Sequence, residues 1–271
     1  NNQLNIEDTY LGQVENSNLD LTQSLVFKTE GSNLAGTQLS INHSINSSAH
    51  GRDLIVGQIE SAHIKSESSY FDYVFDSRIF VNSGYFRAVS NAMVEGHGIL
   101  LSNGEDIRFK GDALVLNNVE QLVGSFSNSV IENAADVNLN GRSLVIRGLN
   151  NGLIHSENSA VNLTNGMHMY GNSNTVSNAH DIRLNGDQNT IRSSSKVMIE
   201  GDNNVVMGVE NVMVKGNDQR IFGDQNKIEG HSNVVIGNQI QIDGNNNVVL
   251  NASSDPIDVD GNGQVVLNAP N

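Results

Sequence analysis

A short pattern of apolar and polar positions repeats along the C-terminal part of the chain. Each repeat ends on a glycine, and the spacings counted from Gly171 are 15, 15, 15, 14, 14 and 17 residues. The glycines that follow are Gly186, Gly201, Gly216, Gly230, Gly244 and Gly261. Self-similarity at a short fixed period is typical of stacked architectures. The pattern predicts an all-β chain folded as a parallel β-solenoid of the β-roll type.

Each repeat contains two short strand-like segments separated by Asn, Gly, Ser and Asp, the residues that favour turns. The first segment has an apolar centre; in successive repeats the central residues are Val176, Ile191, Val206, Ile221, Val235, Val249 and Val266. In the second segment two apolar residues flank a central residue of variable type; for example, Ile182 and Leu184 flank Arg183. Alternation with a period of two indicates a strand with one buried face. We therefore expect coils of 14–15 residues with two strands each.

The repeat is less regular toward the N-terminus. Residues 1–66 carry strand-like alternation without a register that can be assigned, so we expect irregular N-terminal coils or a cap over the open edge of the solenoid. Residues 67–271 are expected to form the solenoid itself, and one continuous solenoid over 1–271 is the alternative. Between Gly141 and Gly171 the repeats are out of phase, which predicts a longer loop.

Residues 70–86 are rich in aromatic side chains. The candidate ligand-binding residues in this segment are Tyr70, Phe71, Tyr73, Phe75, Tyr85 and Phe86. Exposed aromatic rings with Asp nearby stack on sugars or anchor protein partners, so one hypothesis is a binding patch. The alternative hypothesis is a cluster of bulky side chains that fills the interior where the solenoid widens or changes register.

A second candidate surface lies closer to the C-terminus, at the residues that flank the inward-facing centres. These flanking residues become apolar in the later repeats, in the pairs Val205 and Met207, Val234 and Ile236, and Val248 and Leu250. An outward-facing apolar stripe of this length is too large to leave in water on a soluble monomer. We expect an oligomer interface or a partner surface; the alternative is that inside and outside exchange in these coils.

Composition and charge exclude several classes of partner. The formal net charge of −15 argues against nucleic acid, which attracts a basic surface, and against docking on anionic lipid. The chain has no cysteine, no apolar run long enough to span a membrane and no signal-peptide pattern. Because it starts and stops on polar sequence, we interpret it as a piece of a larger protein.

Signals for catalysis or metal binding are weak. The eight histidines lack zinc-ligand spacing, and neither a nucleophile elbow nor a phosphate-binding loop occurs. These absences predict a chain without a cofactor that is not an enzyme, although carboxylates on neighbouring coils could pair as in a glycosidase. The metal candidates are Asp258, Asp260 and Asn262, which match the first half of a calcium loop, but Ala269 stands where a bidentate Glu is required. We expect a structural turn there, with weak calcium binding as the alternative.

Segments such as HSNVVIGNQIQIDG (231–244) resemble the 14-residue repeats of YadA-like heads in trimeric autotransporter adhesins. The resemblance covers residues 171–268 well and the rest loosely, and related trimeric fibre tips share it. It implies a two-stranded β-roll, a homotrimer that buries the apolar stripe, and display on the outer membrane of a Gram-negative cell. The chain departs from the family in its second strand, where large residues such as Ile182 and Leu184 replace alanine.

The sequence and this resemblance favour a non-catalytic adhesive or receptor-binding head or rod of a bacterial surface-exposed or secreted fibre. Its partner is then a protein or glycan on the surface of a host or prey cell, and its location is extracellular. The alternatives are a β-solenoid segment of a large secreted toxin and a glycan-cleaving tail fibre of the phage type. Two acidic residues in one groove beside the aromatic segment would favour glycan cleavage.

One pair of variants tests which side chains face inward. Val206→Asp places an unpaired charge in the inward column and is expected to cost several kcal/mol of unfolding free energy. Arg183→Asp changes a residue that faces water and should be nearly neutral. Thermal unfolding of the two variants checks this, and an equal loss of melting temperature in both would contradict the assignment.

Overall fold

The computed structural model describes residues 4–251 and 257–268 and confirms the predicted fold class. The chain forms a parallel β-solenoid of about 17 coils. It divides into two compact units, Asn1–Asn138 and Leu139–Asn271, each of which is described by itself. Among the described residues there is no helix that could span a membrane.

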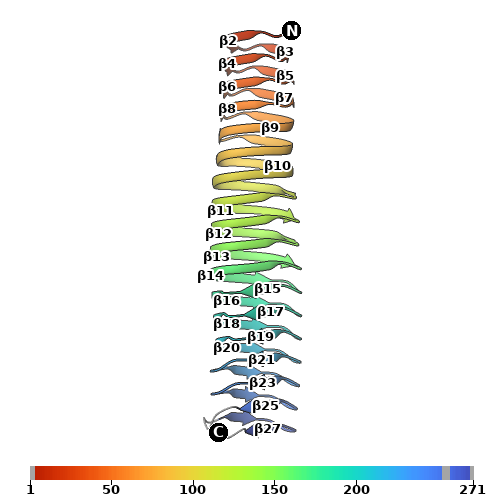
Figure 1. Cartoon of the computed structure of the whole chain (residues 1–271), viewed down its shortest axis with the longest axis vertical. Coiled ribbons are helices and arrows are strands. Elements are labelled where there is room, and N and C mark those ends of the chain that lie inside the picture. The colour runs from red at the N-terminus through yellow and green to blue at the C-terminus, as the bar shows by residue number, and fades with distance from the viewer. Residues whose placement is uncertain (1–3, 252–256, 269–271) are drawn as a thin grey trace. The chain divides into compact units, whose positions relative to one another are not determined.

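The first unit is a stack of coils of uniform length. Its strands are β1 (Leu4–Glu7), β2 (Tyr10–Glu15), β3 (Asn18–Thr22), β4 (Leu25–Glu30), β5 (Asn33–Thr37), β6 (Ser40–Ile45), β7 (Ser48–Arg52), β8 (Ile55–Glu60), β9 (His63–Phe75), β10 (Arg78–Asp112), β11 (Val115–Ser127) and the first part of β12 (Val130–Arg142), whose last residues belong to the second unit. Residues 4–66 share one register with the coils that follow, since Ala49 pairs with Ile64 and Ile64 pairs with Ile79. Strands β9 and β10 run through the corners as continuous ribbons (Figure 1).

The second unit contains the repeats from which the period is read. Its strands are β13 (Val145–Glu157), β14 (Ala160–Tyr170), β15 (Thr175–Ser177), β16 (His180–Asn185), β17 (Thr190–Arg192), β18 (Ser195–Glu200), β19 (Val205–Met207), β20 (Glu210–Lys215), β21 (Arg220–Phe222), β22 (Lys227–Glu229), β23 (Val234–Ile236), β24 (Gln241–Asp243), β25 (Val248–Asn251), β26 (Asp258–Asp260) and β27 (Val265–Asn268). Val206 pairs in register with Ile221, Ile221 with Val235, and Val249 with Val266. These offsets equal the glycine spacings of the same coils, so the predicted coil lengths are confirmed.

The longer loop expected between Gly141 and Gly171 does not exist. Strands β13 and β14 pair with an offset of one ordinary coil, as Ile146 beside Val161 shows. The pattern looked out of phase because Ser156 occupies the position that glycine holds in the neighbouring coils.

The interior is built from columns of apolar side chains stacked from coil to coil. The centres of the short strands are fully buried; in the second unit they include Val176, Ile191, Val206, Ile221, Val235 and Val249. Arg183 is exposed between the buried Ile182 and Leu184, as the alternation predicts. Val205 and Met207, which flank the buried Val206, are partly exposed. Inside and outside therefore do not exchange in these coils.

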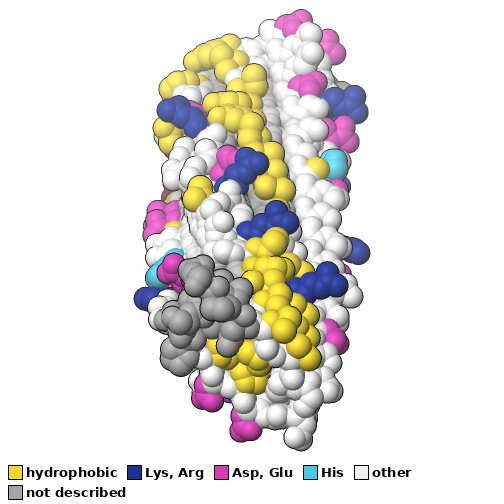
Figure 2. All heavy atoms as spheres, turned by 60° about the horizontal axis from the view of Figure 1, so that its bottom comes forward, with side chains coloured by type: hydrophobic (Ala, Val, Ile, Leu, Met, Phe, Trp, Pro, Cys, Tyr) yellow, Lys and Arg dark blue, Asp and Glu magenta, His cyan; other side chains and the backbone are white. Residues whose placement is uncertain are grey.

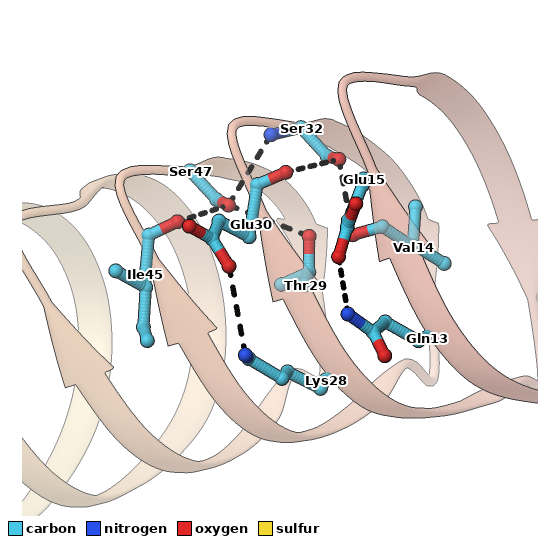
Figure 3. Close-up of polar contacts among 9 residues, drawn as sticks. All are labelled: Gln13, Val14, Glu15, Lys28, Thr29, Glu30, Ser32, Ile45 and Ser47. Atoms are coloured by element: carbon cyan, nitrogen blue, oxygen red, sulfur yellow. Dashed lines mark hydrogen bonds and ion pairs between the residues drawn. The ribbon is translucent and has the colours of Figure 1, made fainter.

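Buried serines satisfy backbone groups at the corners of the first unit (Figure 3). The chain turns at residues with positive φ, such as Gly31 (φ 59°) and Asn46 (φ 48°). After the first of these turns the N–H of Ser32 donates to the Oγ of Ser47 in the next coil (3.3 Å). The Ser47 hydroxyl in turn donates to the carbonyl of Ile45 in its own coil (2.7 Å). One hydroxyl thus satisfies a donor of one coil and an acceptor of the next.

Asparagine and glutamine take over this task in the second unit. The N–H of Asn174 donates to Oδ1 of Asn189 (2.8 Å), and the N–H of Asn189 donates to Oδ1 of Asn204 (2.9 Å). The same buried ladder continues through Gln219, Asn233, Asn247 and Gln264. Among the described residues the Nδ2 atoms of Asn189, Asn204 and Asn233 are buried without a hydrogen-bond partner. The ladder therefore depends on the carbonyl half of each amide.

We expect Asn204→Ala to lower the free energy of unfolding by about 1–3 kcal/mol, because the buried N–H of Asn189 loses its acceptor. Asn185→Ala is the matched control, since Asn185 is exposed on β16. Urea unfolding of both variants measures the difference. Equal midpoints for the two variants would show that the ladder does not stabilise the second unit.

Candidate functional site

The aromatic segment divides into buried and exposed rings. Phe71 and Phe86 are completely buried and stack on each other, with ring centroids 4.7 Å apart at an interplanar angle of 20°. They occupy the inward column, because Val56 pairs with Phe71 and Phe71 pairs with Phe86. Their inclusion among the ligand-binding candidates was wrong; these two rings fill the interior, as the alternative hypothesis expected.

The other four rings lie on the outside of the first unit. Tyr70 and Tyr85 stack at 5.3 Å between centroids, and Phe75 is 46% exposed. Tyr73 is 45% exposed, and the guanidinium of Arg87 lies 5.5 Å from the centroid of its ring.

Asp72 holds this guanidinium in place. An Asp72 carboxylate oxygen lies 3.1 Å from Nη1 of Arg87, and this hydrogen bond raises the pKa of Arg87. Tyr73 is therefore presented beside a fixed cation rather than a free one.

Tyr73 and Phe75 stand at one end of an open groove of about 470 Å³ in the first unit. We call it the aromatic groove; it is lined by residues 73–75, 88–90, 103–105, 118–120, 133 and 135. Its floor includes the buried Val74, Val89 and Val119. Gly104 belongs to the same column, and a Cβ there would come within 2.3 Å of the buried Ile107 side chain in the interior.

The aromatic groove combines amide and carboxylate groups along its length. Nδ2 of Asn118 donates to Oδ1 of Asn103 (2.7 Å), and Nδ2 of Asn103 donates to the carbonyl of Arg87 (3.2 Å), so these two amides are fixed. Glu105 and Glu120 are exposed register partners on neighbouring strands, which lie about 4.8 Å apart. The groove therefore offers ring faces, oriented amides and a pair of acids.

Sequence reasoning missed this acidic pair, although a signal for it exists. Glu105 and Glu120 are separated in the sequence by one coil length, so they become neighbours once the register of β10 and β11 is known.

The apolar stripe near the C-terminus lies on the outer surface of the second unit. Its six predicted residues, Val205, Met207, Val234, Ile236, Val248 and Leu250, are all partly exposed. Between the first and second pairs lie Arg220 and the exposed Phe222, in register with Val205 and Met207. Figure 2 shows hydrophobic side chains gathered in bands with Lys and Arg beside them. A role as an oligomer interface stays a prediction.

The first unit carries a similar stripe that sequence reasoning missed. Its exposed apolar residues recur at one position of the coil, with Ser40 and the partly buried Tyr85 at that position in the two coils between them: Tyr10, Leu25, Ile55, Tyr70, Leu100 and Val115. Polar residues between them in the sequence hide this column until the chain is wound into coils.

The calcium candidates lie on ordinary solenoid positions. Asp258 and Asp260 are exposed on β26, where Nε2 of Gln241 donates to Oδ2 of Asp258 (3.4 Å). The N–H of Asn262 donates to Oδ1 of Asn245 (2.8 Å). Within 4–251 and 257–268 no three His, Cys, Asp or Glu side chains gather as metal ligands. Weak calcium binding at this turn stays a prediction.

Comparison with solved structures finds the same class of fold. No family model matches the sequence, and neither does any curated protein. A variant of AlyGC, a PL6-family alginate lyase, is 7% identical with a TM-score of 0.34, over 98% of this chain and 75% of its own. The Dettilon tailspike protein is 13% identical (TM-score 0.24; 85% and 62%). PfbA, a surface adhesin of Streptococcus pneumoniae, is 10% identical (TM-score 0.21; 90% and 83%).

These similarities extend to the parallel β-solenoid fold, which tailspike and surface adhesin proteins share, and they assign no activity or ligand to this chain. The more specific resemblance to YadA-like heads is not confirmed. The prediction that the chain is not an enzyme, which rested on the absence of catalytic motifs, is wrong. Alginate lyases and an alginate epimerase are among the matched structures. Absence of those motifs does not exclude catalysis on such a fold.

The assignment of some aromatic rings to the interior and others to the surface can be tested by measuring stability. Phe86→Ala removes a fully buried ring and is expected to lower the free energy of unfolding by about 3–5 kcal/mol. Phe75→Ala removes a half-exposed ring and should change it by less than about 1 kcal/mol. Guanidinium unfolding compares the two, and a larger loss for the second variant would reverse the assignment.

Proposed function

We propose that the chain is the glycan-binding part of a bacterial surface-exposed or secreted fibre, and that the aromatic groove holds the glycan. The observation that carries this proposal is the position of Tyr73 and Phe75 at the end of a groove about 470 Å³ in volume. Half-exposed rings present apolar faces on which a sugar ring stacks.

The amides of the groove complement the ring faces. Asn103 and Asn118 are held by hydrogen bonds to each other and to the backbone, so they meet a ligand with little loss of side-chain freedom. Amide groups donate to and accept from sugar hydroxyls. The coils stack with a step of about 4.8 Å, about the length of one sugar unit, so successive units of a linear glycan meet equivalent positions on successive coils.

The charge of the aromatic groove limits the class of glycan that it can bind. Glu105 and Glu120 add two carboxylates side by side, and the chain as a whole carries a net charge of −15. A polyanion would be repelled there, whereas neutral sugar hydroxyls donate to carboxylates. The aromatic groove is therefore suited to a neutral polysaccharide on a host or prey cell surface.

Association of three copies through the stripe from Val205 to Leu250 is part of the proposal. A homotrimer covers partly exposed apolar side chains and carries three copies of the aromatic groove. Binding of one extended polysaccharide by several grooves raises the overall affinity through effective concentration.

Cleavage of the bound glycan is a second candidate function, favoured by the acidic pair. Carboxyl groups about 5–5.5 Å apart are typical of retaining glycosidases. In such a reaction one carboxyl group protonates the leaving oxygen, the other carboxylate attacks the anomeric carbon, and water then releases the sugar. Adhesion and cleavage use the same groove, and the appearance of new reducing ends in wild type but not in Glu105→Gln or Glu120→Gln distinguishes them.

The binding site is tested with the double variant Tyr73→Ala/Phe75→Ala. Affinity electrophoresis in gels that contain neutral polysaccharides, such as a β-glucan, a galactan or a mannan, should retard the wild-type chain in at least one gel. Loss of two stacking rings should weaken binding about 10-fold or more.

Tyr10→Ala is the matched control, because Tyr10 is 63% exposed in the same unit but outside the groove. It should bind as wild type does. Free migration of the wild type in every gel, or equal retardation of the double variant, would rule out glycan binding in the aromatic groove.

A further inference from the structure

A second groove in the first unit encloses about 700 Å³ over residues 35–37, 50–52, 65–67, 80–82, 95 and 96. We call it the corner groove. Its floor is the backbone of one column of residues, Gly36, Gly51, Ser66, Val81 and Gly96, in which Ser66 and Val81 are buried. A Cβ on Gly51 would lie 1.9 Å from the carbonyl oxygen of Gly36, so the backbone there accepts only glycine. The longer side chains on either side of this column form the two walls.

One wall of the corner groove carries a cation that the protein leaves without a partner. Arg52 is paired with Glu67 (3.1 Å), and Glu95 is paired with Lys110 (3.2 Å). In the described part of the chain Lys65 forms no ion pair, although acidic residues outnumber basic ones by 30 to 15. The ammonium group of Lys65 is therefore available to an anionic ligand.

An aromatic ring stands next to this cation. Lys65 pairs in register with His50 on one side and with Phe80 on the other, so the three side chains follow one outward column. The ring of Phe80 is half-buried and lies 5.4 Å from the ring of His63 at a tilt of 51°. The groove thus offers a cation and a supported ring one coil step apart, about 4.8 Å.

We propose that the corner groove binds an acidic polysaccharide, with the carboxylate of one sugar unit paired to Lys65 and the next unit stacked on Phe80. A charged hydrogen bond between ammonium and carboxylate is about twice as strong as a neutral one. A sugar ring presents an apolar face to an aromatic ring, and its length matches the coil step. Thr37 and Asn82 on the opposite wall supply uncharged groups for the sugar hydroxyls.

The pairing within the groove disfavours a phosphate ligand. Phosphate recognition commonly uses the two-pronged hydrogen bonding of a free arginine, and Arg52 is occupied by Glu67. The one free lysine of the groove matches one carboxylate of the bound segment.

The ligand class separates this groove from the aromatic groove. Glu105 and Glu120 suit the aromatic groove to neutral glycans, whereas Lys65 suits the corner groove to acidic ones. The two proposals fail independently, because the variants that test them share no residue.

The test measures binding of the full chain to polygalacturonate and to hyaluronan, each compared with its carboxyl-reduced, neutral form, by isothermal titration calorimetry. Wild type is expected to bind at least one acidic polymer, to lose that binding about 10-fold or more on carboxyl reduction, and to bind more weakly as salt rises. Lys65→Gln should lose affinity for the acidic polymer to a similar extent. Phe80→Ala, made separately, should also weaken binding of the acidic polymer, because the ring on which a sugar stacks is lost.

Lys196→Gln is the matched control, because it removes the same charge from an exposed lysine in the second unit. It should bind as wild type does, and Tyr73→Ala/Phe75→Ala should leave this binding unchanged. Absence of binding to both acidic polymers would overturn the proposal, as would equal affinity for the acidic and reduced forms or an unaffected Lys65→Gln variant.

Discussion

The interior depends on one recurring need: at many corners the backbone N–H that follows a left-handed residue takes its acceptor from a side chain of the next coil. The N–H of Ser32 finds it in the Ser47 hydroxyl, and the N–H of Asn189 finds it in the Asn204 amide. An unmet donor at each corner would cost about as much as a buried polar group without a partner. This need places a polar column inside an otherwise apolar core and fixes how one coil sits on the next.

Once the inward columns are fixed, the outward columns are free to carry chemistry. Side chains at one outward position recur once per coil, so a cation, an acid or a ring is repeated or varied at intervals of about 4.8 Å. Grooves form where an inward-facing column, such as the one that contains Val74, Val89 and Val119, separates two outward columns of longer side chains. The surface therefore consists of parallel outward columns of side chains, and the residues of each column determine which ligands can bind there.

The sequence predicts this fold well wherever a period of two and a regular glycine coincide. The buried Val206 and the exposed Arg183 follow from alternation alone, and the coil lengths follow from glycine spacing. Where serine replaces glycine, as at Ser156, the register is hidden and a false loop is predicted. The prediction for the aromatic segment is partly wrong for another reason. Phe71 and Phe75 have the same chemistry, and only the register shows that Phe71 faces inward. The pairing of two acids on adjacent strands has the same origin, since it depends on a register rather than on a motif.

The buried ladder has a direction, because each donor relies on a side chain of the coil that comes later in the sequence. A coil inserted by duplication brings both a donor for its successor and an acceptor for its predecessor, so the interior is complete again after the event. Duplication in whole units of one coil is thus structurally silent, while a gain or loss of a few residues must be absorbed at a corner. Such a chain can become longer or shorter in evolution by gaining or losing whole coils. The ligand specificity of the outward columns in its existing coils is then unchanged.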